Sequence, residues 1–482
     1  MKNKIISVFL LLFLGFSLSF VYAEETTVLE GDINGNGVIN SIDFKMLWEY
    51  LQSNQDKLYD QRIDMNGDGI INTVDLEILK HHVSTLELHG FYPKESFKAN
   101  NFNQKHMLKY FNDLSFAFYD VLYNSSLDEK HSVSISSMIF NANHMEAIQA
   151  AKQNNIPIRF NLYAKMSELK NILPFEEKRH HLIQLTIDML SQEIVKDTET
   201  YWDGVVIDFE ELRNTRMNPN DGTRENVLYE GKLMSEWYIQ FLQELRQALD
   251  LSEKGLDVYA AVPFSNYYDA YNYREIANIV DRIIVMAHDY EPKQNIPKSD
   301  VMLYLNNPSY VDSLAPITKI DKVIKTLTNE ETGIQDPKKV ILQISFGTAQ
   351  WKFPNVEKAE DWAMISSETE GKYSTPSYEQ IYQRMVSQID TGVPNYIKEL
   401  ESPYIVYHNS MDKSYNFILY EDSRSVAEKI KKTQEAGFSG LSLWSLGRIP
   451  SYENPIRDSI SLELHFDVWS QVLESMGIKH IN

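Results

Sequence analysis

The sequence contains no cysteine among its 482 residues. Disulfide bonds therefore cannot stabilise this chain, which excludes the small disulfide-rich scaffolds. A hydrophobic fraction of 43% can instead supply a sizeable core. The length predicts one large domain accompanied by a small one.

Basic side chains are also scarce. Lysine and arginine number 46 against 68 aspartates and glutamates, so the net charge is −22. Nucleic acids and anionic membrane surfaces are bound by basic patches. The charge balance therefore argues against nucleic acid as a partner and against an anionic membrane surface.

Long apolar runs are missing after residue 20. Residues 1–23 begin with two lysines, continue with an apolar run over 5–20 and end in the small residue Ala23. This pattern is typical of a cleaved secretory signal peptide, and the run is short for a membrane span, which needs about 20 apolar residues. We expect a secreted protein that starts near Glu24, with an uncleaved anchor as the alternative.

Two segments share one acidic pattern, DINGNGVINSID at 32–43 and DMNGDGIINTVD at 64–75. Calcium takes six to eight oxygen ligands, and alternate positions of an EF-hand loop point inward around it. Gly37 and Gly69 occupy the sixth position, where the chain must turn sharply. The candidate calcium ligands, which include two backbone carbonyls, are Asp32, Asn34, Asn36, Val38, Asn40 and Asp43 in the first copy and Asp64, Asn66, Asp68, Ile70, Asn72 and Asp75 in the second.

A helical pattern follows each loop. Apolar residues recur at 44, 47 and 51 after the first loop and at 76, 79 and 83 after the second. A duplicated calcium loop and helix resembles the type I dockerin domain, here over residues 30–87. The resemblance implies two bound Ca²⁺ ions and, as partner, a cohesin module of a scaffold protein. It also implies a cellulosome-type complex of an anaerobic bacterium.

In the dockerin family the tenth and eleventh loop positions contact cohesin. Here those positions hold Ser41 and Ile42, then Thr73 and Val74. The apolar second member departs from the common Ser-Thr pair, so the particular cohesin stays open. Ordinary helix capping and packing is the alternative role for these four residues.

From residue 88 onward, short apolar runs alternate with longer helical patterns. Eight such runs lie at 89–92, 114–121, 158–164, 204–210, 256–263, 282–289, 339–347 and 440–446. Most are continuous, as expected for parallel strands covered on both faces. The pattern predicts an α/β fold, a (β/α)8 TIM barrel over 88–482. The segment from 352 to about 420 predicts an inserted α+β subdomain after strand seven, with short strands at 405–408 and 416–420.

The fourth run, YWDGVVIDFEEL, contains two adjacent carboxylates. Alternate strand residues share a face, so Asp208, Glu210 and Val206 all point into the barrel. Glu210 lies at the carboxyl end of the strand, where active sites of this fold lie. Two carboxylates beside an apolar wall repel each other, and one keeps its proton. Glycosidic cleavage needs such an acid and such a stabiliser.

This strand resembles the DxxDxDxE signature of glycoside hydrolase family 18, the chitinase family. Two further motifs agree, Met286-Ala287-His288-Asp289 and the tryptophan of GLSLWSLG, Trp444. Three segments, SLAPITKIDKVIKTL, KVILQISFG and ILYEDSRSVAEKI, resemble the branch that contains spore-cortex and peptidoglycan N-acetylglucosaminidases. The resemblance implies hydrolysis of β-1,4-linked N-acetylglucosamine glycans without a cofactor for catalysis.

The family mechanism assigns Glu210 as acid and base and Asp208 as the group that stabilises the substrate's own attacking acetamide. The residues that the resemblance assigns to substrate binding are Asp203, His288, Asp289, Tyr290 and Trp444. Two positions depart from the family. Val206 replaces the middle aspartate of the signature, and His288 replaces a tyrosine that bonds the acetamide.

Several assignments have structural alternatives. Asp208 and Glu210 could form a buried structural pair, Asp203 could hold the start of its strand, and His288 and Trp444 could be core residues. Trp351 lines a subsite or packs under the insertion, and three tyrosines after strand five, at 267, 268 and 271, border the cleft or pack at a helix entry.

The substrate also stays open. Chitin comes first, because dockerin enzymes usually attack insoluble polysaccharides. Peptidoglycan or spore cortex follows, and the glycans of N-glycoproteins come third. A non-catalytic, lectin-like barrel is the alternative of another class, although such members typically lose the acid that Glu210 supplies here.

Overall fold

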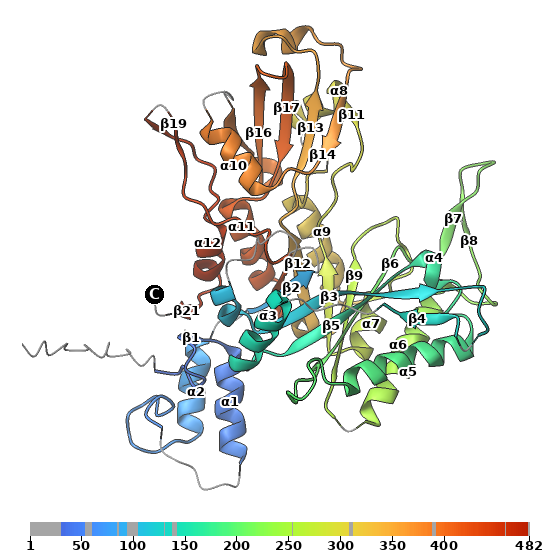
Figure 1. Cartoon of the computed structure of the whole chain (residues 1–482), viewed down its shortest axis with the longest axis vertical. Helices are drawn as coiled ribbons and strands as arrows, with labels where there is room; N and C mark the ends of the chain where they lie inside the picture. The colour runs from blue at the N-terminus through green and yellow to red at the C-terminus, as the bar shows by residue number, and fades with distance from the viewer. Residues whose placement is uncertain are drawn as a thin grey trace, which may run out of the picture.

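The computed structural model describes residues 30–53, 60–83, 86–93, 105–129, 131–136, 142–252, 254–307, 312–387, 392–457 and 459–480 (Figure 1). The predicted signal peptide at 1–23 lies outside these residues. Within them, no helix has the length and apolar character to cross a membrane.

Eight parallel strands close into a barrel. They are β2 (Glu87–Pro93), β3 (Asp113–Tyr123), β5 (Ile158–Lys165), β6 (Gly204–Glu210), β9 (Asp257–Pro263), β10 (Arg282–Met286), β12 (Val340–Ser345) and β18 (Gly440–Trp444). They pair in the order β2-β18-β12-β10-β9-β6-β5-β3, and pairing of β2 with β3 closes the ring. All eight predicted strands are confirmed, as is the barrel fold.

Helices cover the outside of the barrel, as the alternating pattern predicts. They are α3 (Ala142–Gln153), α5 (Glu176–Ser191), α6 (Met234–Asp250), α7 (Tyr273–Ile279), α9 (Ile317–Leu327), α11 (Ser423–Glu435) and α12 (Val468–Ser475), with a short α4 at Met166–Leu169. The 3-10 helix η2 (Lys105–Tyr110) stands between β2 and β3. In α6, Trp237, Phe241 and Leu245 recur every fourth residue and are buried, which explains how this helix attaches to the strands.

Three short antiparallel strand pairings lie in the connections between the barrel elements. A short strand β4 (Val133–Ile135) pairs antiparallel with the end of β3. The hairpin of β7 (Thr215–Met217) and β8 (Arg224–Asn226) follows β6, and β19 (Ile456–Arg457) pairs with β20 (Ile460–Ser461). Figure 1 shows the β7–β8 hairpin projecting from the barrel.

The predicted insertion after the seventh barrel strand is present as a second sheet. Its elements are β13 (Ala349–Phe353), η5 (Ala359–Met364), β14 (Glu370–Ser374), α10 (Tyr378–Val386), β15 (Val393–Ile397), η6 (Lys398–Leu400), β16 (Ser402–Asn409) and β17 (Ser414–Leu419). The strands predicted at 405–408 and 416–420 correspond to β16 and β17. The sheet order is β11-β14-β13-β17-β16-β15.

The subdomain is larger than predicted. The preceding connection contributes β11 (Ile296–Pro297), which pairs with β14, and α8 (Lys298–Asn306). Trp351 is fully buried in the core of this sheet, and its indole N–H donates to the carbonyl of Gln294 at 2.9 Å. Trp351 is therefore a core residue of the inserted subdomain.

The N-terminal unit consists of two helices and their loops. Helix α1 spans Ser41–Gln52 and α2 spans Thr73–His82; the asparagine before each accepts a hydrogen bond from the first turn as N-cap. Strand β1 (Val38–Ile39) pairs with the C-terminal strand β21 (Lys479–His480). Figure 1 shows this unit at the opposite end of the molecule from the inserted subdomain.

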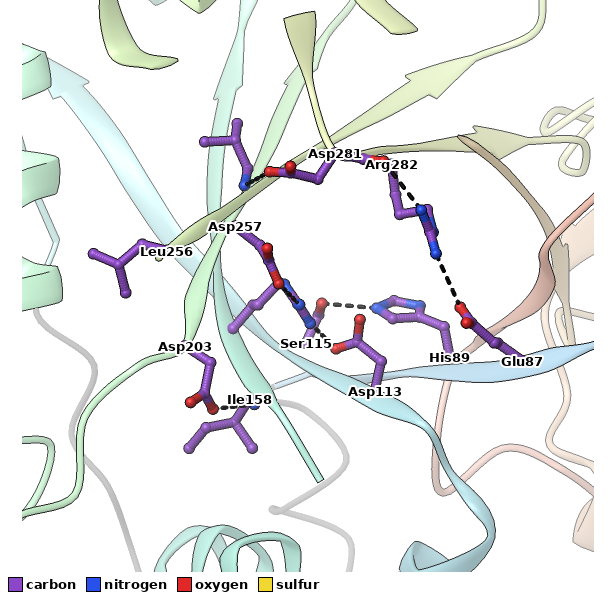
Figure 2. A network of polar contacts seen from close by, with 12 residues as sticks. Glu87, His89, Asp113, Ser115, Ile158, Asp203, Leu256, Asp257, Asp281 and Arg282 are labelled. Carbon is purple, nitrogen blue, oxygen red and sulfur yellow. Dashed lines mark hydrogen bonds and ion pairs between the residues drawn. The ribbon is translucent and has the colours of Figure 1, made fainter. Parts of the chain in front are cut away.

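A buried polar network fills the end of the barrel where the strands begin (Figure 2). Arg159 of β5 is 2% exposed and donates to the carboxylates of Asp113 on β3 and Asp257 on β9. Its guanidinium also lies 4.0 Å from the ring centre of Tyr259. His89 lies beside it and bonds Ser115 at 2.8 Å. These ion pairs tie strands β3, β5 and β9 together inside the barrel.

The Arg159→Ala substitution should destabilise the fold by about 3–5 kcal/mol, since it leaves the buried Asp113 carboxylate without its cation. Denaturant unfolding and thermal melting would measure the loss. The exposed pair of Arg216 and Glu225 offers a matched control, and Arg216→Ala should cost less than about 1 kcal/mol. Equal effects of the two substitutions would contradict a structural role for the buried network.

Candidate active site

Asp208 and Glu210 lie on β6, with their side chains toward the carboxyl end of the barrel. β6 pairs in register with β5, which sets Tyr163 beside Asp208 and Lys165 beside Glu210. Asp208 is 3% exposed, whereas Glu210 at the end of the strand is partly exposed. The two carboxyls therefore lie two residues apart on the same face of β6, and the carboxyl of Glu210 is accessible to a bound molecule.

Burial raises the pKa of both carboxyls. For Asp208, burial and the neighbouring Glu210 charge raise the pKa well above its ordinary value. Burial likewise raises the pKa of Glu210, against the opposing charges of His288 and Lys165. The pair thus retains a proton at a pH where isolated carboxyls are ionised, which is the condition for a general acid.

Asn161 of β5 supplies a hydrogen bond that the sequence analysis missed. Its side-chain nitrogen donates to Asp208 Oδ2 at 3.1 Å, and Asn161 stands directly opposite Val206 in the β5–β6 register. Val206 occupies the position of the missing middle aspartate, so the neighbouring strand replaces that partner with an amide. The alternation of polar residues at 159, 161 and 163 in an otherwise apolar strand could have indicated it.

His288 follows β10 and lies between two oxygen acceptors. Its Nε2 is 2.8 Å from Gln343 Oε1, and its Nδ1 is 3.2 Å from Asp289 Oδ1. Gln343 donates its own amide N–H to Ser442 Oγ at 3.1 Å, which turns its oxygen toward the imidazole. An oxygen beside each nitrogen favours the doubly protonated ring, although only the Nε2 contact has hydrogen-bond geometry. Although burial opposes the charge, Asp289 and these hydrogen bonds raise the pKa of His288.

Asp289 stays ionised in this arrangement. Burial opposes its charge, but His288 and Lys293 outweigh it and lower the pKa of Asp289 below its usual range. The Lys293 ammonium lies 2.6 Å from Asp289 Oδ2. His288, Asp289 and Lys293 therefore form one chain of charges beside Glu210.

A cavity of about 700 Å³ adjoins this cluster. Asp289 and Trp444 line it from the barrel, and Tyr373 and Ser377 line it from the inserted subdomain. Asp208 and Glu210 are not among the lining residues, so the cavity continues from the site rather than enclosing it. A cleft of this size between barrel and insertion can hold sugar units.

Trp444, at the end of β18, packs against other aromatic rings at the mouth of the barrel. Its ring centre lies 5.4 Å from that of Phe91 and 5.5 Å from that of Phe118. The indole is only partly buried and faces the cavity. It can therefore serve as an apolar floor under a sugar ring, because the C–H face of a sugar is apolar.

Glu291 is a second carboxyl of the cavity that the sequence analysis missed. It is 6% exposed, lines the cavity and accepts a hydrogen bond of 3.4 Å from the hydroxyl of Tyr373. Burial raises the pKa of Glu291 to about 7. Its charge therefore changes near neutral pH.

The structure does not bring Asp203 to the site. This residue precedes β6, at the opposite end of the barrel from Glu210, and Figure 2 shows it among the groups of that end. Its Oδ2 accepts from the backbone N–H of Ile158 and from Lys152 Nζ, both at 2.7 Å. Asp203 therefore fixes the start of its strand and is not part of the proposed site.

Tyr290 and the tyrosines after β9 also lie outside the cluster. The Tyr290 hydroxyl is buried, and the residue does not line the cavity. Tyr271 is buried and its hydroxyl donates to the carbonyl of Phe209 at 2.7 Å, so it fixes the backbone between the two carboxyls. Tyr267 is 52% exposed and stacks under the guanidinium of Arg213; Tyr268 contacts the same group.

The two acidic loops share one geometry that fits calcium. In each, the first aspartate accepts backbone N–H groups of the fifth and sixth residues, at 3.0 and 2.7 Å for Asp32 and at 3.1 and 2.8 Å for Asp64. Gly37 and Gly69 adopt φ of 80° and 81°. Burial raises the pKa of Asp43 to about 6, a penalty that a bound cation would remove.

Carboxylates alone do not complete these loops. Across the described ranges, no three His, Cys, Asp or Glu side chains gather as a metal-binding group. A cation therefore depends also on the asparagine and backbone oxygens, such as those of Asn34 and Val38, as the spacing predicts. Oxygen donors of this kind suit Ca²⁺.

Comparison with known proteins agrees with this geometry. The sequence model of Glycosyl hydrolases family 18 matches residues 87–448. The chain belongs to this family. The model of the Dockerin type I domain matches residues 30–84, so a dockerin precedes the glycosidase barrel.

One curated relative is the Cortical fragment-lytic enzyme of Bacillus subtilis (strain 168), 21% identical over 264 residues, or 54% of this chain. The chain spans about half the length of this relative, 50%.

Solved structures share the fold. The C-terminal domain of a putative chitinase from Desulfitobacterium hafniense DCB-2 aligns with TM-score 0.56 and 16% identity, over 82% of this chain and 99% of that one. The spore cortex-lytic enzyme SleL of Bacillus megaterium QM B1551 aligns with TM-score 0.52 and 17% identity, over 80% and 73%.

Asn161→Leu should lower kcat by about 10- to 100-fold, because the lost hydrogen bond to a charged carboxylate is worth about 1.5–3 kcal/mol. The amide also lowers the pKa of Asp208. Its removal should raise that pKa further and move the acidic limb of the pH–rate profile to higher pH. A melting temperature near wild type would serve as the folding control. Unchanged kcat and an unchanged limb would exclude Asn161 as the group that positions Asp208.

Proposed function

We propose that the barrel hydrolyses β-1,4-linked N-acetylglucosamine glycans with retention of configuration, and that the dockerin holds it on an extracellular scaffold. The observation that supports this most directly is the pair of raised-pKa carboxyls, Asp208 and Glu210, at the carboxyl end of β6 beside a cavity with an aromatic floor. The predicted signal peptide supports secretion.

In the proposed mechanism, Glu210 donates its proton to the glycosidic oxygen as the bond to the anomeric carbon breaks. The acetamide oxygen of the same sugar attacks that carbon, which yields an oxazolinium ion. Asp208, held by Asn161, orients the acetamide and stabilises its positive charge. Glu210, now ionised, removes a proton from the water that opens the ring. Each of the two steps inverts the configuration of the anomeric carbon, so the configuration is retained overall.

The charged cluster after β10 supports the same sugar. Asp289 lies at the cavity and accepts from sugar hydroxyls, while Trp444 provides the apolar surface beneath the ring. His288 holds Asp289 ionised and keeps positive charge near Glu210. Because both His288 nitrogens already face acceptors, we propose that it tunes the carboxyls rather than bonding the acetamide as the family tyrosine does.

Chitin is the first proposed substrate, because a scaffold-borne enzyme gains most on an insoluble polymer. A glycan of the spore cortex or of peptidoglycan is the second candidate, and the similarity to the Cortical fragment-lytic enzyme favours it. The intact acid at position 210 argues against the non-catalytic, lectin-like alternative.

Glu210→Gln should reduce kcat at least about 10²-fold on a soluble chitooligosaccharide, because glutamine cannot donate the required proton. Glu211→Gln changes the adjacent carboxyl, which pairs with Lys165 at 2.8 Å, and should retain activity within a few-fold. Near-normal hydrolysis by Glu210→Gln would overturn the catalytic assignment.

The first product released should be the β-anomer, which proton NMR can detect before mutarotation, and a thiazoline analogue of the oxazolinium should inhibit competitively. Colloidal chitin and purified peptidoglycan should be incubated in parallel and the released reducing ends identified by mass. An α-anomer, or no inhibition by the thiazoline, would exclude substrate assistance. Cleavage of peptidoglycan alone would decide for the second candidate.

A further inference from the structure

The two calcium-loop copies have unequal surroundings. In the first copy, Val38 is fully buried and Ile42 is 7% exposed, and both belong to the hydrophobic core of the barrel. Their counterparts 32 residues later, Ile70 and Val74, are 62% and 51% exposed. The same positions of a duplicated motif are therefore covered in one copy and open in the other.

Polar contacts also attach the first copy to the barrel. Asn112 donates to Ser41 Oγ at 2.8 Å, and Asn34 donates to the carbonyl of Asn154 at 3.1 Å. Strand β1 pairs with β21 at the C-terminus. Figure 1 shows the start of α1 against the barrel. The corresponding residue to Ser41 in the second copy, Thr73, is exposed.

Few residues connect the module to the barrel. Helix α2 ends at His82 and β2 begins at Glu87, so four residues join them. Four residues reach about 14 Å at full extension. Release of the first copy would expose the apolar side chains of Val38 and Ile42 to water, and this cost opposes detachment. The short connection would also keep a released module close to the barrel.

We propose that the dockerin binds its cohesin through the second copy alone, because the first copy's equivalent surface fixes the module to the barrel. This inference rests on the cohesin partner of the proposed function. The docking surface consists of Ile70, Thr73 and Val74, with the exposed pair Glu77 and Lys80 at its edge. An apolar centre with a charged rim is typical of a protein interface.

The covered copy supports a protein as occupant. Ser41 and Ile42 already bind a protein surface, that of the barrel, by one hydrogen bond and one buried apolar side chain. Thr73 and Val74 offer the same two groups, unoccupied by the barrel. A single open copy gives the enzyme one orientation on the scaffold, whereas two open copies related by the duplication would allow two.

The duplication provides matched variants for the test. The full chain, the double variant Thr73→Ala/Val74→Ala and the double variant Ser41→Ala/Ile42→Ala are titrated against a panel of type I cohesin modules in calcium. The second-copy variant should lose at least about 30-fold in affinity. The first-copy variant should stay within about 3-fold of the full chain.

Equal losses for the two variants, or a loss confined to the first-copy variant, would overturn the proposal. Binding of no cohesin in the panel by the unmodified chain would overturn the cohesin partner itself. Hydrolysis by the same samples tests the barrel independently, so failure of the docking proposal and failure of the enzymatic proposal are distinguishable. Chelation of calcium should remove cohesin binding and spare hydrolysis.

Amide hydrogen exchange on the unmodified complex gives a readout that does not depend on folding of a variant. Cohesin should slow exchange at the start of α2 and leave the start of α1, already protected by the barrel, unchanged. Slowed exchange at both helix starts, or at α1 alone, would contradict a single docking surface.

Discussion

The parallel register between β5 and β6 is the constraint on which the site depends. It sets Asn161 against Val206, and the two-residue alternation of strands then carries Asp208 and Glu210 to the interior face. A shift of one residue would turn both carboxyls outward into the helical layer. The closed barrel prevents such a shift, since each strand is bonded on both sides.

The two ends of the barrel use charge in opposite ways. At the end where the strands begin, Arg159 neutralises the buried carboxylate of Asp113 and the partly exposed one of Asp257, and so joins three strands. At the other end, Lys165 pairs with Glu211 instead, and burial raises the pKa of both Asp208 and Glu210 in spite of the nearby cations. One network stabilises the fold, whereas the other retains a reactive proton. The fold thus stabilises one end and keeps unfavourable electrostatics at the other, where chemistry is expected.

The additions to the barrel each contribute to the proposed function. The inserted subdomain supplies Tyr373 and Ser377 to the wall of the cavity and so lengthens the space beyond Trp444. In Figure 1 the dockerin packs against the barrel at the end of the molecule opposite the inserted subdomain, which lines the cavity. The proposed scaffold contact therefore lies away from the cavity. A bulky glycan could enter without displacing the scaffold.

The sequence by itself determined the barrel, the insertion, the paired calcium loops and the reactive strand. These features follow from local regularities, namely hydrophobic period, ligand spacing and alternation along one strand. Only the tertiary structure decided which residues from other strands meet them. Asn161, Gln343 and Glu291 reach the site from separate strands and loops, so no local spacing reveals them. The same holds for Asp203. The family signature includes this residue, but the length of β6 places it at the opposite end of the barrel from Glu210. It holds again for the two dockerin copies, whose sequences are nearly equivalent. They differ because the barrel, a surface distant in sequence, covers only the first.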